Sequence, residues 1–429
     1  MAAHRPMTVA EKYYTFLDHC WRINVLISAD LDICLDPAFV LDRWRAFRNR
    51  RVLTRAVPTE ELTLVDLGQD VAQHGDLFRA VELPTSEWDS VLDEEAAQPH
   101  ELALPMRLRY VTSTAEGRSR VLIVGHHSMI DGRIGLDEVQ AFVRFLDGQE
   151  VPEQQELSIP APPTSTHPWQ QDARARIELL RSIRSRNLAL GEPGPADWPA
   201  ADVERRPRLR QVVLEPEQAS RLLTAGRSHG SSAFSTVAAA WLATVARHVC
   251  GAGPGTPAPT LQLAVPADAS APSDDPSRPA AMAVPVLARR FRVPDDDVWG
   301  LASEVLGTVR EALQRGEGDL FFQLTRVAGV DDLAEGAALV GAGIAGGPPC
   351  VVVSNMGVVD PGSDPDWLHH VQGQLAAAPN QMVFAATLSY RGRLVHTIST
   401  DTGRIPAERA AEMTESYLAL IRDLAAVDR

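Results

Sequence analysis

The sequence predicts an α/β protein built from two halves, each a mixed β-sheet packed with helices. Segments typical of strands and of helices alternate along both halves, and 45% of the residues are hydrophobic while 23% are charged, as in ordinary globular proteins. A chain of 429 residues exceeds what one hydrophobic core usually holds, so we expect two subdomains. The proline-rich segment 150–168 is the expected junction, which gives subdomains of residues 1–165 and 166–429.

The expected elements of the first half are a strand over residues 22–29, an amphipathic helix over 36–51 and a buried strand over 121–125. In the second half, the expected helices cover residues 169–190, 215–225, 229–249, 295–323 and 407–426. The expected strands cover residues 209–214, 261–265, 283–293, 350–354, 382–390 and 393–400. Segments 251–259 and 268–279 are rich in small residues and proline, so we expect loops there.

The buried strand over 121–125 stops at two adjacent histidines, within the segment VLIVGHHSMIDG. His126 and His127 are followed by Asp131 and Gly132, in a pattern that we write HHxxxDG. A neutral imidazole at the rigid end of a strand can take a proton from a hydroxyl or amine as that group attacks a carbonyl. Because adjacent strand residues point to opposite faces, we expect only one of the two histidines to face a substrate cavity.

His126 and Asp131 are expected to support this base. A carboxylate before a glycine that permits a sharp turn can fold back and fix the loop by hydrogen bonds, which we expect of Asp131. Two alternatives stay open: the histidines are satisfied polar residues at a strand end, or they bind a metal ion together with Asp131. The alternation along the strand argues against the metal site, since both imidazoles can hardly reach one ion.

The segment HHSMIDG resembles the signature of the condensation-domain and chloramphenicol-acetyltransferase-like superfamily. This superfamily includes nonribosomal peptide condensation domains, polyketide-associated acyltransferases and wax-ester synthases. The resemblance implies two chloramphenicol-acetyltransferase-like subdomains with an active-site channel at their interface. It also implies that His127 is the general base, that Asp131 is mainly structural and that Gly132 keeps the approach to the base open. No acyl-enzyme is implied, because acceptor and acyl thioester meet directly at the base.

A second segment, VVVSNMGVVD over residues 351–360, resembles the family's second motif, a strand followed by a turn. Ser354, Asn355 and Gly357 fit the SNxG form of the polyketide-associated branch, which favours a tailoring acyltransferase over a peptide-bond-forming domain. Ser354 and Asn355 are therefore candidates for lining the channel. Asn355 or nearby backbone amides are candidates for stabilising the oxyanion.

The partner of Asp131 stays open. Family members commonly pair this aspartate with an arginine at the end of a P-x-x-x-R stretch. The corresponding segment is VPADAS, in which Ser270 stands where the arginine is expected. Arg289, Arg290 and Arg292 are the alternatives.

Together these features predict an acyltransferase that moves an acyl group from a coenzyme A or carrier-protein thioester to a hydroxyl, in the tailoring of a natural product or lipid. The expected donor, acyl-CoA or a phosphopantetheinyl acyl carrier protein, is a substrate, and no cofactor or metal is expected. The acceptor is expected to be a small molecule with a hydroxyl or, less readily, an amine. The alternatives are amide formation of the nonribosomal-peptide type and a non-catalytic recruitment module, which tends to lose the histidine pair that this chain keeps.

Charge and cysteine content limit which partners and which compartment we expect for this protein. The net charge of −15 argues against a nucleic acid, because phosphate binding requires a basic surface. The four cysteines, Cys20, Cys34, Cys250 and Cys350, show no paired spacing, so we expect free thiols in a reducing compartment. No segment has the length of a membrane span and the N-terminal residues lack the apolar core of a secretory signal, so we expect a cytoplasmic protein, as a monomer.

The first half contains an arginine-rich segment, which we interpret as the solvated face of a helix. The alternative is that it binds the phosphates of coenzyme A or an acidic carrier protein. Its members are Arg43, Arg45, Arg48, Arg50, Arg51 and Arg55. In the second half, Gly341, Gly343 and Gly346 match the dinucleotide-binding pattern GxGxxG. The prolines that follow leave no room for the helix that such a site needs, so we expect a flexible loop.

Two more features are interpreted as non-catalytic. His369 and His370 lack a following Asp-Gly and lie in a polar segment with proline, so we expect them at the surface. Tyr13 and Tyr14 are expected to pack in the core, with lining of a cavity as the alternative.

Overall fold

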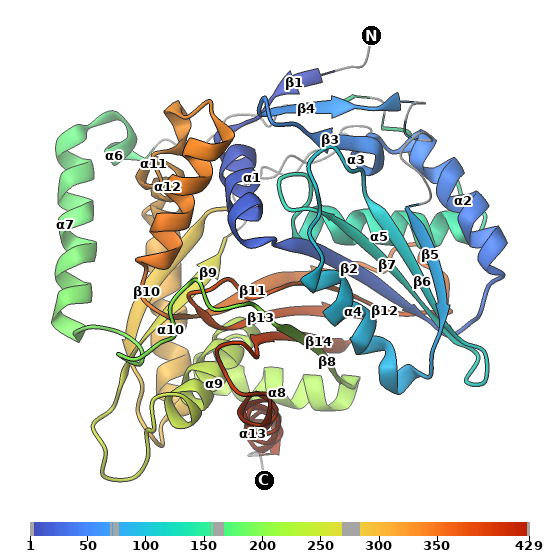
Figure 1. Cartoon of the computed structure of the whole chain (residues 1–429). Helices are drawn as coiled ribbons and strands as arrows, with labels where there is room; N and C mark the ends of the chain where they lie inside the picture. The colour runs from blue at the N-terminus through green and yellow to red at the C-terminus, as the bar shows by residue number, and fades with distance from the viewer. Residues whose placement is uncertain are drawn as a thin grey trace.

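The computed structural model describes residues 4–68, 71, 77–154, 156–157, 167–267 and 284–426. The expected subdomain boundary between residues 165 and 166, the expected loop over 268–279 and Ser270 lie outside these residues. Two large mixed sheets with helices against them make up most of the molecule, which confirms the predicted α/β class (Figure 1).

The N-terminal sheet has five strands, of which only β5 and β6 pair in parallel. In spatial order they are β12 (Leu368–Leu375), β2 (Asn24–Leu31), β7 (Arg118–His126), β6 (Arg107–Ser113) and β5 (Phe78–Glu82). Every residue of β2 is buried, because α5 (Gly132–Leu146) packs on one face of the sheet and α4 (Trp88–Ala97) on the other. The strands predicted over 22–29 and 121–125 are confirmed as β2 and β7.

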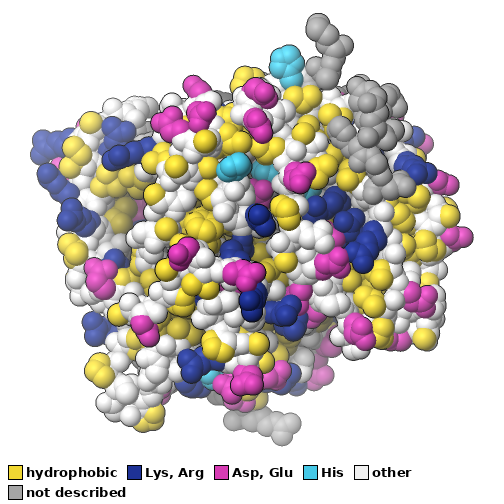
Figure 2. All heavy atoms as spheres, viewed as in Figure 1, with side chains coloured by type: hydrophobic (Ala, Val, Ile, Leu, Met, Phe, Trp, Pro, Cys, Tyr) yellow, Lys and Arg dark blue, Asp and Glu magenta, His cyan; other side chains and the backbone are white. Residues whose placement is uncertain are grey.

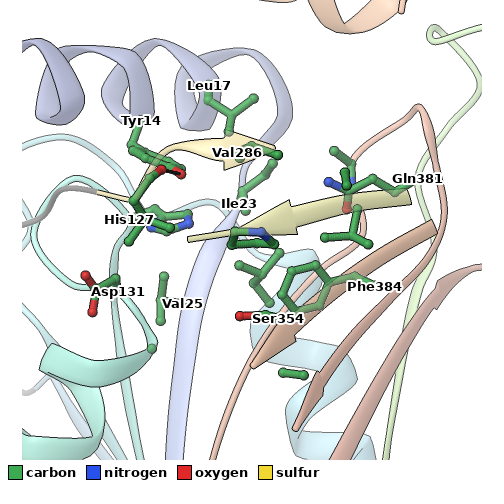
Figure 3. Close-up of a pocket in the computed structure, with 18 of the residues that line it drawn as sticks. Tyr14, Leu17, Ile23, Val25, His127, Asp131, Val286, Ser354, Gln381 and Phe384 are labelled. Atoms are coloured by element: carbon green, nitrogen blue, oxygen red, sulfur yellow. Dashed lines mark hydrogen bonds between the residues drawn. The ribbon is translucent and has the colours of Figure 1, made fainter. Parts of the chain in front are cut away.

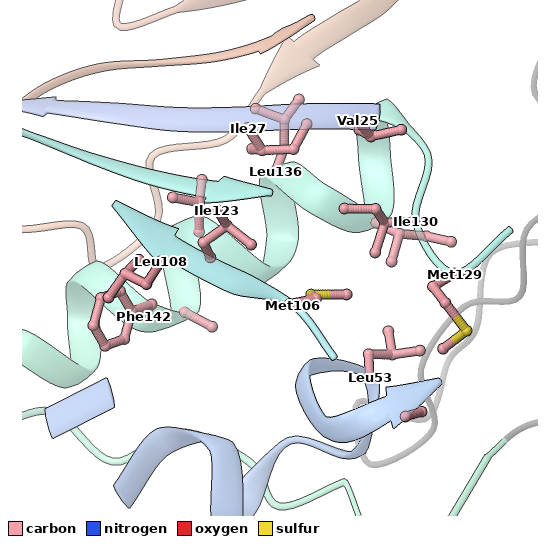
Figure 4. Packing of buried hydrophobic residues seen from close by; sticks show 14 of the residues in the cluster. Val25, Ile27, Leu53, Met106, Leu108, Ile123, Met129, Ile130, Leu136 and Phe142 are labelled. Carbon is pink, nitrogen blue, oxygen red and sulfur yellow. The ribbon is translucent and has the colours of Figure 1, made fainter. Parts of the chain in front are cut away.

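The core of this half lies between the sheet and α5 (Figure 4). Ile27 of β2 and Ile123 of β7 point to the same face and belong to one buried cluster with Leu136 of α5. Gly135 permits this close packing, because a Cβ there would lie 2.3 Å from Cγ1 of Ile27. Helix α5, which follows directly on Asp131, is therefore held against the sheet.

The C-terminal sheet has six strands, and its central strand β11 is parallel to both neighbours, β9 and β13. In spatial order the strands are β10 (Val286–Arg292), β9 (Thr260–Pro266), β11 (Cys350–Val359), β13 (Gln381–Tyr390), β14 (Arg393–Asp401) and β8 (Pro207–Leu214). Four helices pack against one face and share a hydrophobic core with it: α8 (Pro216–Ser228), α9 (Ala233–His248), α10 (Val298–Gln314) and α13 (Ala407–Ala426). The opposite face contributes to a cavity between the halves.

Strand β12 joins the two halves, because it comes from the second half of the chain and pairs antiparallel with β2 in the N-terminal sheet. It also contacts β14 of the C-terminal sheet, where the Thr397 hydroxyl donates to the backbone oxygen of Gly373 at 2.9 Å. The expected surface position is wrong for one histidine of the pair in this strand, whereas His369 is partly exposed. His370 is buried, and its Nε2 lies 3.4 Å from a carboxylate oxygen of Asp30 on β2.

Two predicted helices of the second half are interrupted. The helix expected over 169–190 is split into α6 (Pro168–Gln171) and α7 (Ala173–Leu190), because the side chain of Asp172 caps α7 by accepting from the Arg174 amide. The helix expected over 295–323 ends with α10, and Gly316 in the left-handed region precedes the short α11 (Leu320–Leu324). The remaining predicted helices of this half are confirmed.

A smaller layer precedes and flanks the N-terminal sheet. Strands β1 (His4–Pro6), β4 (Thr63–Asp66) and β3 (Ala56–Pro58) form a three-stranded sheet. Helix α1 (Val9–Trp21) begins with a capping box, in which the Thr8 hydroxyl accepts from the Glu11 amide and the Glu11 carboxylate accepts from the Thr8 amide. This helix contributes directly to the cavity described below.

The glycine pattern of the second half lies in a helix, so the expected flexible loop is wrong. Gly341 and Gly343 belong to α12 (Leu333–Ala345), and Gly346 caps its end. Close packing on α1 explains the small residues, since a Cβ on Gly336 would lie 2.3 Å from Phe16 and one on Gly341 would lie 3.2 Å from the Cys20 sulfur. Of the pattern, Gly341 therefore lies at the contact between the two helices, whereas a Cβ on Gly343 would meet no atom of the described residues within 4 Å.

The arginine-rich segment spans α2 (Pro37–Arg50) and α3 (Val52–Arg55), and the interpretation as a solvated face is wrong for half of it. Arg48, Arg51 and Arg55 are buried. The Arg51 guanidinium is paired with Glu138 of α5, with Nε 3.0 Å from the carboxylate, and Arg55 is paired with Asp66 at 2.7 Å. Two of the three buried arginines are thus paired with carboxylates inside the fold. Among the described residues, no helix is long and apolar enough to cross a membrane.

Candidate active site

A cavity of about 270 Å³ lies between the two halves of the molecule. It is lined by α1, by residues at or near the cavity-facing ends of β2 and β7, by α12 and by the uncovered face of the C-terminal sheet (Figure 3). His127, Asp131, Ser354 and Asn355 all contribute to its wall, so the two sequence motifs meet there. His126 is absent from that wall, as expected from the alternation along β7.

His127 is held in one tautomer by its neighbours. Its Nδ1 lies 3.2 Å from the backbone oxygen of Ile130. Because a carbonyl oxygen can only accept, this contact places the proton on Nδ1 and leaves Nε2 as the basic atom of the ring. Burial lowers the pKa of His127 to about 4, so the imidazole is neutral at pH 7.

Tyr14 of α1 packs against the base. Its ring centroid lies 4.1 Å from that of His127, and its hydroxyl donates to the backbone oxygen of Val284 at 2.6 Å. Tyr13 also lines the cavity, so both tyrosines pack in the core, as expected, and at the same time line the cavity, which was the alternative. The capping-box pattern ahead of α1 was a sequence signal for this helix, although it did not show what the helix faces.

His126 lies on the other side of the strand end and is buried. The Ser128 amide donates to its Nδ1 at 3.1 Å, which leaves the proton on Nε2. That atom lies 3.2 Å from a carboxylate oxygen of Asp18, one helical turn after Tyr14 on α1. Burial opposes ionisation of Asp18, but the contacts that favour its charged form, chiefly that with His126, outweigh burial and lower the pKa of Asp18.

Asp131 fixes the start of α5, as the sequence suggested for a supporting carboxylate. Its side chain accepts a hydrogen bond from the Ile134 amide at 2.9 Å and so caps the helix. The sharp turn expected at Gly132 is wrong, because this residue has no positive φ and begins the helix. A Cβ at Gly132 would lie 2.7 Å from the sulfur of Met356, so the glycine provides space for the second motif.

The second motif forms a bulge inside β11, whereas a turn after the strand was predicted. Pairing with β13 is interrupted between Asn355 and Val358 and then resumes. Gly357 has φ +76°, which favours glycine, and its amide donates to Oδ1 of Asn355 at 3.2 Å. The bulge places Ser354, half-buried, and Asn355, exposed, in the cavity wall.

The arginines proposed as partners of Asp131 are engaged elsewhere or lie at a strand end. Arg289 forms a buried ion pair with Glu317, and Arg290 lies 3.3 Å from Glu192. Arg292 is the exposed last residue of β10. Asp131 itself caps helix α5 through the Ile134 amide.

One of the four cysteines lines the cavity. The four cysteines are free, as predicted, and burial raises the pKa of the cavity-lining Cys350 thiol to about 12. Within the described ranges, no three side chains of the His, Cys, Asp or Glu type are grouped as metal ligands.

Comparison with known proteins adds the following. Residues 203–407 match a family model described as the C-terminus of phthiocerol/phthiodiolone dimycocerosyl transferase. No curated protein matches the sequence.

Solved structures resemble the chain over 99% of its length. The structure of polyketide synthase associated protein 5 from Mycobacterium tuberculosis matches with a TM-score of 0.63, 17% identity and 99% of its own chain covered. TRI3 trichothecene 15-O-acetyltransferase from Fusarium sporotrichioides matches with a TM-score of 0.70 and 13% identity, and 96% of its chain is covered. The first condensation domain of the calcium-dependent antibiotic synthetase matches with a TM-score of 0.67 and 17% identity, and 97% of its chain is covered. The chain therefore has the two-sheet fold of the condensation-domain and chloramphenicol-acetyltransferase-like superfamily, and its C-terminal half is similar to the polyketide-associated transferases.

Proposed function

We propose that the protein is an acyltransferase that moves an acyl group from a coenzyme A or carrier-protein thioester to a hydroxyl, with His127 as general base. The observation that carries this proposal is the position of His127. Its ring lines a cavity between the two halves, and the Ile130 contact leaves Nε2 as the proton acceptor. The family match of the C-terminal half and the shared fold support acyl transfer as the class of reaction.

In the proposed reaction, Nε2 of His127 takes the proton of the acceptor hydroxyl while its oxygen attacks the thioester carbonyl. The resulting tetrahedral intermediate collapses as the carbon–sulfur bond breaks, and the leaving thiolate takes the proton back from Nε2. Ester and free thiol are the products, and no covalent bond to the protein forms. The base is weakened by burial, yet it is ready at neutral pH because it carries no proton there.

The developing oxyanion needs hydrogen-bond donors. The hydroxyl of Ser354 and the amide NH₂ of Asn355 are the side-chain donors that the second motif adds to the cavity wall. Oδ1 of Asn355 accepts from Gly357, so this contact orients the amide and leaves its nitrogen for an incoming oxyanion. Asp131 would act through the position of α5 and His126 through the order of the strand end.

An amine acceptor is the second candidate, because the fold is also that of a peptide condensation domain. The first experiment therefore offers the purified protein acyl-CoA or an acyl-loaded carrier protein together with alcohol and amine acceptors, and identifies products by mass spectrometry. Ester formation supports the proposal, and amide formation alone would transfer it to the second candidate. Activity only with the loaded carrier would reject free coenzyme A as donor.

The decisive variant is His127→Ala. We expect kcat to fall by about 10²-fold or more, because positioned general bases contribute that much, while the melting curve stays cooperative. His19→Ala is the matched control, because His19 is an exposed histidine on α1 outside the cavity. Unchanged turnover in His127→Ala would contradict the catalytic role of His127, whereas no turnover by the parent protein with any of these donors and acceptors would favour a recruitment module.

A further inference from the structure

The two faces of the C-terminal sheet bury different kinds of side chain. Along each strand, successive residues point to opposite faces. Leu263, Val351 and Val383 point to the helix-covered face and belong to the core shared with α9, α10 and α13. Their neighbours Ala264 and Val352 belong to a separate apolar cluster, which lines the cavity.

Strand register aligns four cavity-lining residues in one row across the sheet. Val352 of β11 is paired with Ala264 of β9 on one side and with Phe384 of β13 on the other, and Ala264 is paired with Ala288 of β10. All four line the cavity. The side chains of this row increase in size from the two alanine methyl groups on β10 and β9 to the isopropyl group of Val352 and the phenyl ring of Phe384. The sheet therefore forms a floor with most space over β9 and β10, and the phenyl ring on β13 forms a side wall.

Helices and loops face this floor with apolar groups. Leu17 of α1, Phe321 of α11 and Ile344 of α12 each line the same cavity. Figure 3 shows Leu17, Ile23 and Val286 between His127 on one side and Gln381 on the other. The space beside the proposed base is thus bounded by hydrocarbon both above and below.

The polar side chains of the sheet lie toward the two ends of this floor. Ser354 is near the motif end, while Gln262 and Gln381 are both paired with Cys350 at the start of β11. Strand residues rise about 3.3 Å each, so about 13 Å separates the levels of Cys350 and Ser354. A hydrocarbon segment of medium length fits between these levels.

We propose that the row formed by Ala288, Ala264, Val352 and Phe384 is the floor and wall of a groove that binds an aliphatic chain of medium length. This inference rests on the proposed acyl transfer, because the aliphatic chain is taken to be part of a substrate that reacts at His127. The chain belongs either to the acyl group of the donor or to an alcohol acceptor, which share this chemistry. Each methylene that the groove buries favours the longer substrate by roughly fourfold.

The test measures kcat/KM for acetyl, butyryl, octanoyl and palmitoyl thioesters with one acceptor, and then for ethanol, butanol and octanol with one donor. In one of the two series we expect octyl compounds to exceed two-carbon compounds by at least about tenfold. Ala264→Leu fills the floor and should reduce this preference about tenfold, whereas Phe384→Ala removes the wall and should shift it toward longer chains. Ala338→Leu, the same exchange on the exposed face of α12, should keep the parental profile.

Calorimetric binding makes the groove testable without turnover. Octanoyl-pantetheine is compared with pantetheine, and octanol with ethanol, on the parent protein and on Ala264→Leu. Tighter binding of one octyl compound to the parent, weakened in Ala264→Leu, supports the groove and identifies which substrate carries the chain. Equal binding of the long and short compounds, or an identical length profile in the parent and Ala264→Leu, overturns it. Absence of all acyl transfer together with chain-dependent binding would contradict the proposed function and leave the groove standing.

Discussion

His126 and His127 are neighbours in the chain, yet the two sides of β7 on which they lie have different surroundings. On one side, the Nε2–H of His126 meets the buried carboxylate of Asp18. On the other side, His127 meets a backbone carbonyl, a tyrosine ring and an apolar cavity. The His126 ring therefore has a carboxylate as its partner. The His127 ring is bonded to a backbone carbonyl instead, so burial keeps it neutral and leaves Nε2 as its basic atom.

The same helix contacts both histidines. Asp18 follows Tyr14 by four residues on α1, so both side chains lie on one face of the helix and reach adjacent residues of β7. Helix α1 is packed in turn on the glycines of α12. The position of the proposed base therefore depends on contacts between the first and second halves of the chain. Figure 2 shows one face of the molecule in the view of Figure 1, with hydrophobic side chains dispersed among charged ones.

Of the changes that test the difference between the two histidines, His126→Ala should have the largest effect on stability. This change leaves the Asp18 carboxylate buried without its partner, so we expect a loss of about 3 kcal/mol in the free energy of unfolding, measured by urea denaturation. His127→Ala should cost clearly less stability and more activity. A double variant, Asp18→Asn with His126→Ala, should recover part of the loss. Equal stability of His126→Ala and the parent would refute the supporting role of this histidine.

Gly132→Ala tests how the two motifs fit together. The added Cβ would lie 2.7 Å from the Met356 sulfur, so we expect a loss of about 1 to 3 kcal/mol from overpacking, with a lower kcat. Met356→Ala in the same chain should relieve the clash, and a double-mutant cycle measures this coupling. Additive effects of the two changes would show that the residues do not limit each other.

Tyr14→Phe should have the smallest effect of these changes. It keeps the ring against His127 and removes the hydrogen bond to the Val284 oxygen, at a cost of about 1 kcal/mol in stability. Tyr14→Ala should in addition change KM and the pH dependence of turnover, because the ring also lines the cavity. If both variants behave alike, the ring has no role beyond its hydroxyl.

The features that the sequence predicted correctly are local ones. Alternation along β7 assigned one histidine to the cavity, and the backbone hydrogen bond expected of the Asp131 carboxylate is present, although it caps a helix where a sharp turn was expected. These inferences need only the period of a strand and the chemistry of a helix start. The overall class was predicted from the order of such segments, and the division into residues 1–165 and 166–429 remains a prediction.

The errors arose where the partner is distant in the sequence. His370 is buried because β12 returns to the N-terminal sheet and meets Asp30, a pairing that no local pattern encodes. Arg51 is buried because Glu138 reaches it from α5. The glycine pattern lies in α12, on which α1 packs closely at Gly336 and Gly341, so a helix was mistaken for a loop. Tertiary contacts override local preference in all three cases.

The state of the His127 ring is the central claim, and ¹⁵N NMR of the imidazole nitrogens during a pH titration tests it most directly. The His127 signals are assigned by their loss in His127→Gln. The account predicts a neutral ring at pH 7 with the proton on Nδ1, and a pKa of about 4 in place of the usual 6.5. Because protonation removes the base, kcat/KM should fall only below the same pH. A proton on Nε2, or a charged ring at neutral pH, would contradict the account.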